Sequence, residues 1–315
     1  MSVTISPESP ILVTGGSGYI ASWIVRQLLE KGHTVHATVR SKSKTHKYAH
    51  LTKIAESAPG TLKIFEADLL KDGSFAEGMA GCELVMHTAS PFVIRGIKNP
   101  QKELVDPALK GTRNVLDSVN ATDSVKRVVL TSSVVSIYGD NREIEDKKEG
   151  KFTENHWNTT SSLKHQPYSY SKVLAEKEAW KIVDGQERWD MVVINPAFVL
   201  GPSLTENSNS ASLDFMKGIL SGEMKMGAPD LSFGLVDVRD VAQAHLEAGY
   251  RADAAGRHIT CGTETAVSMV EIGKVLKEKF GKNHPFPTRT LPKFMMYLVG
   301  PMAGFNWSGG GGTFG

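Results

Sequence analysis

The chain of 315 residues is long enough for one large α/β domain or for a core domain with a smaller partner. Its composition is 40% hydrophobic and 22% charged, and a formal net charge of +2 gives no reason to expect nucleic acid as a partner. No apolar run reaches the roughly 18 residues of a membrane span, so we expect a cytoplasmic protein that does not engage a membrane. Cys82 and Cys261 lack metal-ligand spacing; we expect buried free thiols and no metal site.

The first predicted unit is a strand, a glycine-rich turn and a helix. Residues 11–13 are typical of a buried strand, residues 14–21 read Thr-Gly-Gly-Ser-Gly-Tyr-Ile-Ala, and residues 19–30 have helical periodicity. Small residues let a backbone approach a pyrophosphate, and a helix N-terminus offers free N–H groups. A merely tight turn is the alternative. The pattern predicts a nucleotide site that includes Gly15, Gly18, Tyr19 and Ile20.

The second predicted strand, residues 33–39, ends at Arg40, followed by Ser41, Lys42 and Lys44. A carboxylate at this point would bind the ribose hydroxyls of NAD and repel a 2′-phosphate. A guanidinium can instead bind a phosphate through two hydrogen bonds. A solvated basic helix start would explain the lysines but not the missing acid. Arg40 and Lys44 therefore predict NADP(H) rather than NAD.

Further strands follow at βα spacing, at residues 62–65, 84–87, 127–130 and 191–194. Strands that alternate with helices imply a doubly wound parallel sheet, a Rossmann fold, whose ligands bind at the carboxyl ends of the strands. Candidate cofactor contacts at those ends are Asp68, Leu69, Thr88, Ala89, Ser90, Asn195 and Pro196, and candidate substrate contacts are Pro91 and Phe92. We interpret His87 as a strand-end histidine with its hydrogen bonds satisfied.

Tyr168 and Lys172 form a Tyr-x-x-x-Lys pair. In a helix that begins near Tyr168 they lie one turn apart on the same face. An ammonium beside a phenol favours the phenolate, so the tyrosine is expected to become an acid usable near neutral pH. The pair alone is weak evidence, because tyrosine and lysine are common in helices. Its place downstream of a nucleotide turn and of Thr131-Ser-Ser133 makes it a catalytic candidate.

The remaining sequence suggests a second, smaller lobe. Residues 138–167 are charged and poor in periodicity, which favours a substrate-side loop in which Trp157 caps a pocket. We expect residues 1–195 to form the NADP-binding domain. Residues 196–315 are expected to form mainly the substrate-binding lobe, with a return to the first domain around 234–262. The glycine-rich tail, residues 308–315, cannot hold a fold.

Along nearly its whole length the chain resembles the extended short-chain dehydrogenase/reductase superfamily. Within it, the chain is most similar to the branch of dihydroflavonol 4-reductase, cinnamoyl-CoA reductase and methylglyoxal (aldehyde) reductase. The matching segments come in the family's order: 13–20, 37–40, 87–91, 129–133, 168–176, 195–196 with 201–202, and 236–242.

The resemblance implies a role for each matching residue. Ser133 would hydrogen-bond the substrate carbonyl, with Ser132 as an open alternative, and Tyr168 would donate the proton. Lys172 would hold the nicotinamide ribose and lower the pKa of the tyrosine, and Arg40 would meet the 2′-phosphate of NADP. Hydride arriving at a carbonyl carbon builds an alkoxide, which a fixed O–H donor and a nearby acid stabilise.

Three positions depart from the pattern: Ala21 ends the fingerprint, Pro107 stands before Gly111-Thr112 where many members carry an asparagine, and Tyr138 stands where flavonoid reductases place a substrate-binding asparagine. The second puts an asparagine-based proton relay in doubt. Tyr138, itself a candidate substrate contact, makes a smaller aldehyde or ketone the expected substrate rather than a flavonoid.

The leading hypothesis is therefore an NADPH-dependent carbonyl reductase acting on an aldehyde, ketone or β-keto ester as a monomer or homodimer. An NAD-dependent sugar-nucleotide epimerase or dehydratase is the alternative, because such enzymes share the Tyr-Lys pair. A protein that senses NADP without catalysis is the third hypothesis.

Overall fold

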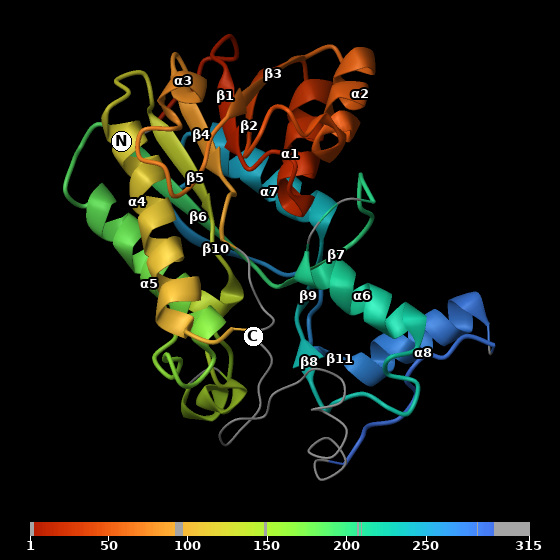
Figure 1. Ribbon diagram of the computed structural model, residues 1–315. Coiled ribbons are helices and arrows are strands. Elements are labelled where there is room, and N and C mark those ends of the chain that lie inside the picture. Colours follow the sequence, from red (N-terminus) through yellow and green to blue (C-terminus); the bar gives the residue numbers. More distant parts are fainter. Residues whose placement is uncertain are drawn as a thin grey trace.

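The computed structural model describes residues 3–91, 97–147, 150–206, 208, 210–281 and 283–292. Its centre is a seven-stranded sheet in the order β10-β6-β5-β4-β1-β2-β3 (Figure 1), and every neighbouring pair is parallel. The strands are β1 (Ile11–Thr14), β2 (Thr34–Val39), β3 (Thr61–Glu66), β4 (Leu84–His87), β5 (Arg127–Thr131), β6 (Asp190–Pro196) and β10 (Gly256–Thr260). The strand order reverses beside β1, which brings the ends of β1 and β4 to the point where such folds bind ligands.

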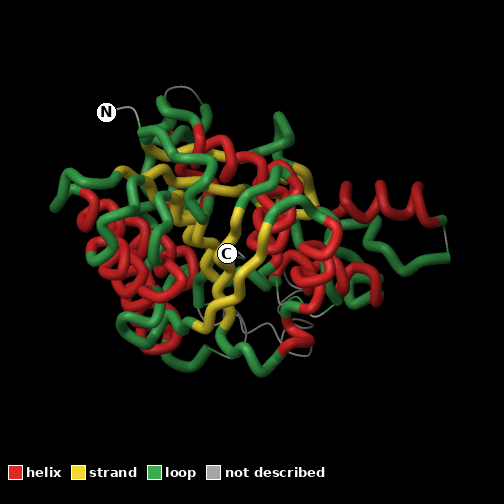
Figure 2. Tube along the Cα trace, turned by 90° about the horizontal axis from the view of Figure 1, so that it is seen from above, coloured by secondary structure: helices red, strands yellow, loops and turns green. Residues whose placement is uncertain are grey.

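Helices cover both faces of the sheet, as the near-continuous apolar strands require. On one face α1 (Tyr19–Glu30) packs against α7 (Val238–Tyr250) and α2 (Ala49–Ser57). On the other face lie α3 (Ala76–Met79), α4 (Asp106–Asn120) and α5 (Pro167–Val183), and a single π-helical turn, Gln101–Val105, leads into α4. The end-on view shows the strands between these two helical layers (Figure 2). The predicted doubly wound parallel sheet is confirmed.

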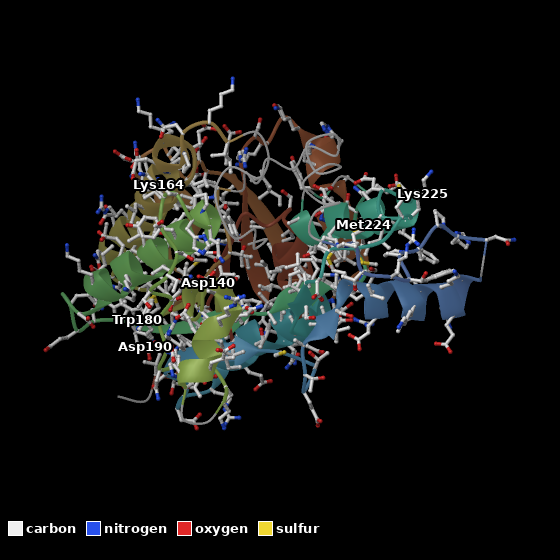
Figure 3. The ribbon with its side chains drawn as sticks, turned by 90° about the horizontal axis from the view of Figure 1, so that it is seen from below. Asp140, Lys164, Trp180, Asp190, Met224 and Lys225 are labelled. Carbon is white, nitrogen blue, oxygen red and sulfur yellow. The ribbon has the colours of Figure 1, made fainter. Side chains whose placement is uncertain are left out.

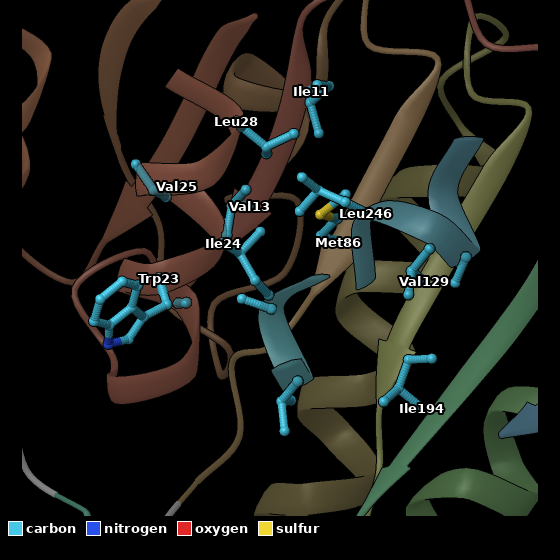
Figure 4. Packing of buried hydrophobic residues seen from close by; sticks show 14 of the residues in the cluster. Ile11, Val13, Trp23, Ile24, Val25, Leu28, Met86, Val129, Ile194 and Leu246 are labelled. Atoms are coloured by element: carbon cyan, nitrogen blue, oxygen red, sulfur yellow. The ribbon is translucent and has the colours of Figure 1, made fainter. Parts of the chain in front are cut away.

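Alternate residues of each strand enter the two halves of the core. Val13, Met86, Val129 and Ile194 point toward the layer of α1 and α7, where Leu246 meets them (Figure 4). Their neighbours along the strands, including Leu12, Val85 and Val128, join the layer of α4 and α5. All of these side chains are 6% exposed or less, so the sheet is a rigid base for what its ends carry.

The C-terminal part of the chain has a small apolar cluster of its own, away from the sheet. It contains α6 (Ala211–Ser221) and α8 (Met269–Phe280), which bring Ile219 and Ile272 together with Phe286. Two short sheets accompany it, β8 (Ser232–Phe233) with β11 (Val267–Ser268), and β7 (Phe198–Leu200) with β9 (Leu235–Asp237). Seen from below, Met224 and Lys225 mark this side, opposite Trp180 and Asp190 (Figure 3).

Between these C-terminal elements the chain returns to the main sheet. Helix α7 packs on α1, and β10 pairs with β6, within the predicted return at 234–262. The division into two domains at residue 195 itself stays a prediction. Phe92 and residues 308–315, also considered above, lie outside the described residues.

Strand β6 ends at Pro196, which pairs with Thr260, because proline is tolerated where the ladder does not need its N–H. One expectation about the cysteines was wrong, because we expected both thiols to be buried. Cys82 is, and burial raises its pKa to about 12, but Cys261 follows the last residue of the edge strand β10 and is exposed.

Within the described part of the chain no helix is long and apolar enough to cross a membrane. The same residues contain no cluster of histidine, cysteine or acidic side chains that could hold a metal ion.

Candidate active site

The glycine turn after β1 is held against the end of β2. The amide of Gly15 donates to Thr38 Oγ1 at 3.0 Å, and that of Gly16 donates to the Thr38 carbonyl at 2.8 Å. Gly15 has a φ of +64°, which favours glycine, and a Cβ on Gly16 would lie 2.8 Å from that of Ala37. The two glycines therefore let the turn lie flat on the neighbouring strand.

Helix α1 starts at this turn with an N-terminus suited to an anion. Gly18, the N-cap residue, has no side chain to satisfy the first amides, and the first turn carries no acidic residue. The Tyr19 hydroxyl donates to the Gly201 carbonyl at 2.7 Å, and burial raises its pKa to about 12. Tyr19 and Ile20 thus have backbone amides, rather than the phenol, to offer a pyrophosphate.

The candidates for the adenosine half of a dinucleotide lie beyond β2 and β3. Arg40 and Lys44 are exposed. An acidic residue that is distant in the sequence lies near them in the fold. Glu66, at the end of β3, accepts the Lys42 amide at 2.8 Å. Asp68 accepts the Leu70 amide at 2.8 Å, which shapes the turn after β3.

Helix α5 presents Tyr168 and Lys172 at the carboxyl ends of β4, β5 and β6. Gln166, just before the helix, has a left-handed backbone with φ of 52°, and Pro167 opens the first turn. The Lys172 ammonium nitrogen lies 5.7 Å from the centre of the Tyr168 ring and donates to Ser90 Oγ at 2.8 Å. Tyr168, Lys172 and Ser90, 82 residues from the lysine, therefore share one site.

The expected lowering of the tyrosine pKa is not found, because burial has the opposite effect. Burial raises the pKa of Tyr168 to about 12 and lowers that of Lys172 to about 8. Each shift favours the neutral form, because both side chains are removed from water and the charge of one is not close enough to outweigh this. The loss of water around the two side chains, which depends on the whole fold, explains the difference from the expectation.

The structure distinguishes between the two serines after β5. The Ser132 hydroxyl is buried, donates to Glu176 Oε2 and contacts Ser136 Oγ at 3.0 Å. Ser133 is only half-buried, and its hydroxyl accepts the Val135 amide at 3.3 Å. This arrangement leaves Ser133 with an O–H to donate, whereas Ser132 is engaged in the interior.

A small cavity lies behind Lys172, between α4 and α5. Its volume, about 30 Å³, is enough for one or two water molecules. His87, Ser132, Lys172 and Glu176 contribute to its walls, as do the predicted contacts Leu69, Ala89, Ser90 and Pro91. His87 Nδ1 is paired with Thr14 Oγ1 at 2.9 Å, and burial followed by the charge of Lys172 lowers its pKa to about 3.

Several predicted residues lie elsewhere or use other atoms. The Thr88 hydroxyl donates to the Thr14 carbonyl, and the Asn195 amide donates to the Ser133 carbonyl at 3.1 Å. Tyr138 stacks on Phe152, and Trp157 lies over the Arg257 guanidinium at 3.9 Å. Trp157 lines a separate surface depression that does not include Lys172. The contacts thus engage Asn195 and Trp157 in holding neighbouring segments.

Sequence reasoning missed Glu176 and Arg257. Glu176 lies one turn after Lys172 on α5 and is fully buried, and Arg257 on β10 binds it at 2.6 Å. Glu176 is in the family-like segment 168–176, and a carboxylate on the inner face of a buried helix requires a partner. That rule could have indicated that a cation was needed, but not which one.

The site fits a dinucleotide along the carboxyl edge of the sheet. The flat glycine turn, the uncapped start of α1 and the two exposed cations after β2 form a path with donors for phosphates. Lys172 and Ser90 lie at the other end of this path, where a nicotinamide ribose would be held.

Comparison with known proteins identifies the family. Residues 11–262 match the model of the NAD dependent epimerase/dehydratase family. The chain is 44% identical to cinnamoyl-CoA reductase CAD2 of Medicago truncatula over 273 residues, 86% of this chain and 80% of the relative. It is 39% identical to tetraketide alpha-pyrone reductase 2 of Arabidopsis thaliana, over 89% of this chain and 85% of the relative.

The chain belongs to the NAD dependent epimerase/dehydratase family. Among solved structures, it is similar to Gre2 of Candida albicans in complex with NADPH, with a TM-score of 0.73, 27% identity and 93% of each chain covered. The predictions of the extended short-chain dehydrogenase/reductase superfamily, of its reductase branch and of an oxidoreductase are confirmed at this level. In this family member the roles of individual side chains stay predictions.

Proposed function

We propose that the protein reduces the carbonyl group of a small molecule to an alcohol with NADPH. The observation that carries the proposal is the meeting of Tyr168, Lys172 and Ser90 at the end of the sheet that also bears the glycine turn. The relatives named above are reductases, and the solved Gre2 structure holds NADPH. Arg40 and Lys44 supply the cations that the 2′-phosphate of this cofactor requires.

Bound NADPH would supply a hydride to the carbonyl carbon. The side chains of this chain handle the oxygen. Ser133 and Tyr168 donate hydrogen bonds to it, and as negative charge develops the Tyr168 proton moves to it, which completes the alcohol. The Lys172 ammonium, one turn away, stabilises the phenolate that remains. This stabilisation acts against burial, which raises the pKa of Tyr168 to about 12.

The test follows NADPH consumption with aldehydes, ketones, β-keto esters and a cinnamoyl thioester, beside the same panel with NADH. We expect turnover that prefers NADPH and that falls about 10²- to 10⁴-fold in Tyr168→Phe. Tyr170→Phe is the matched control, because Tyr170 is in the same helix two residues away and is not part of the Tyr-x-x-x-Lys pair.

Two outcomes would redirect the proposal. A purified protein that carries tightly bound NAD and ignores the panel would favour the sugar-nucleotide alternative. NADPH binding without turnover of any carbonyl would favour a sensing role. Full activity in Tyr168→Phe would refute the mechanism.

A further inference from the structure

A buried polar network lies directly behind the proposed catalytic side chains. At its centre is the carboxylate of Glu176, whose side chain is 0% exposed. Glu176 Oε2 accepts the Ser132 hydroxyl and, at 3.0 Å, the Asn195 amide, while Oε1 accepts Arg257 Nε at 2.6 Å. One side chain of α5 therefore connects the ends of β5 and β6 with β10.

The network reaches Ser133 through its backbone. The Asn195 amide that binds Glu176 also donates to the Ser133 carbonyl at 3.1 Å. Ser132, next in the chain, is held by Glu176 directly. Because Glu176 is four residues after Lys172 and eight after Tyr168, the same helix sets the position of all three proposed catalytic side chains.

Arg257 supplies the charge that makes the buried carboxylate tolerable, and it uses its remaining donors on the loop beside the site. It donates to the carbonyls of Glu154 at 2.7 Å, His156 at 2.5 Å and Ser136 at 3.4 Å, and its face lies against Trp157. The side chain is 7% exposed. The guanidinium is thus enclosed by the segments that follow the catalytic serine and precede α5.

We propose that Glu176, held by Arg257, is a positioning residue that fixes the Ser132-Ser133 segment against the helix of Tyr168 and Lys172. This inference rests on the proposed function for its effect on turnover. Its structural part, that Glu176 holds residues 131–137 in place, is independent of any substrate.

The chain offers a matched control at the opposite ends of the same strands. Arg127, the first residue of β5, is fully buried and pairs with Asp190, the first residue of β6, at 2.7 Å. It also donates to three backbone carbonyls, as Arg257 does. Both ion pairs join a buried arginine to a carboxylate, but the Asp190 side chain is 35% exposed whereas that of Glu176 is fully buried. One pair lies at the carboxyl end with the site and the other at the amino end.

The experiment compares Glu176→Gln with Asp190→Asn, which make the same chemical change. Both are expected to lower the midpoint of urea unfolding. Only Glu176→Gln is expected to lower kcat, by about tenfold or more, with the NADPH dissociation constant within about threefold of the parent, and Glu176→Asp should recover part of the loss. Hydrogen exchange gives the readout without substrate: the amides of Ser136, Ile137 and Tyr138, bonded within their own turn, should exchange faster only in Glu176→Gln.

Equal kcat in parent and Glu176→Gln, or unchanged exchange at the amides of Ser136, Ile137 and Tyr138, would overturn the inference while Tyr168→Phe still tests the proposed function. A similar loss of kcat in Asp190→Asn would also overturn it, since general loosening would then be enough. If Tyr168→Phe keeps full activity, the proposed function fails, and the exchange result alone decides the positioning role.

Discussion

The ammonium of Lys172 and the hydroxyl of Ser90 meet at 2.8 Å, one from the second turn of α5 and the other from the loop after β4. The contact joins two segments far apart in the sequence; Lys172 was expected to serve both catalysis and cofactor binding, and Ser90 to bind cofactor. It holds a half-buried cation at the edge of the sheet.

The pH dependence of turnover should report on this contact. Burial lowers the pKa of Lys172 to about 8, so the ammonium is lost as pH rises through that value, and kcat/KM, which reflects the free enzyme, should fall above it. In Ser90→Ala the ammonium loses an acceptor worth about 1.5 kcal/mol, and the midpoint should move about one pH unit lower. Ser57→Ala, on the exposed end of α2, is the control. An unshifted profile in Ser90→Ala would contradict this role.

Arg40→Asp should weaken the preference for NADPH over NADH. The replacement removes a bidentate donor and sets a carboxylate against the 2′-phosphate, so we expect the ratio of kcat/KM values to fall about 10- to 100-fold. Lys47→Asp makes a charge change of the same size in the exposed turn beyond it and should leave the ratio within about threefold. Equal effects of the two variants would mean that general charge, not Arg40, selects the cofactor.

Acid should destabilise the fold through two buried histidines. Burial lowers the pKa of His87 to about 3 and that of His245 to about 4, whereas an unfolded imidazole titrates near 6.5. Between these values the unfolded chain binds more protons, so the free energy of unfolding is largest above pH 6.5 and falls as pH drops. The loss should reach about 5 kcal/mol at about pH 4.5.

Urea unfolding at several pH values measures this slope. His245→Gln should reduce the slope clearly, because it removes one of the two histidines with the largest pKa shifts, while His258→Gln on the exposed edge of β10 should not change it. A pH-independent stability across this window would show that the imidazoles are protonated in the folded protein.

Gly16→Ala should destabilise the protein by crowding β2. The added methyl would lie 2.8 Å from Ala37 Cβ, and overpacking of this kind costs about 1–3 kcal/mol. Ala37→Gly in the same chain removes the opposing methyl and should restore most of the loss of unfolding free energy, whereas Gly185→Ala, with only ordinary contacts, is a neutral site for comparison. Failure of the double variant to recover would show that the turn, not the contact with Ala37, needs glycine.

The position of a helix could be predicted from the sequence where residues that start and end helices flank it. The helix expected at residues 19–30 is α1, which begins after the N-cap residue Gly18 and ends before Gly32, a glycine with φ of +87°. Parallel strands place their carboxyl ends at the same edge of the sheet, so Ser90 and Asn195 were expected at one edge before any contact was known.

The sequence could not supply what depends on three-dimensional partners. Glu176 and Arg257 are 81 residues apart, and no feature of either segment predicts that the two side chains pair. The direction of the Tyr168 pKa shift depends on how much water the surrounding elements exclude. Likewise, Cys261 is exposed because β10 is an edge strand, which only the strand order reveals.

Helix α1 holds a second segment in place besides the glycine turn. The Tyr19 hydroxyl and the Trp23 indole N–H donate to the carbonyls of Gly201 and Pro202, the two residues that follow β7 and lead to α6. The same helix therefore follows directly on the glycine turn and also holds the segment that leads to the C-terminal elements. Two hydrogen bonds therefore join the start of α1 to the segment after β7 directly, without passing through the sheet.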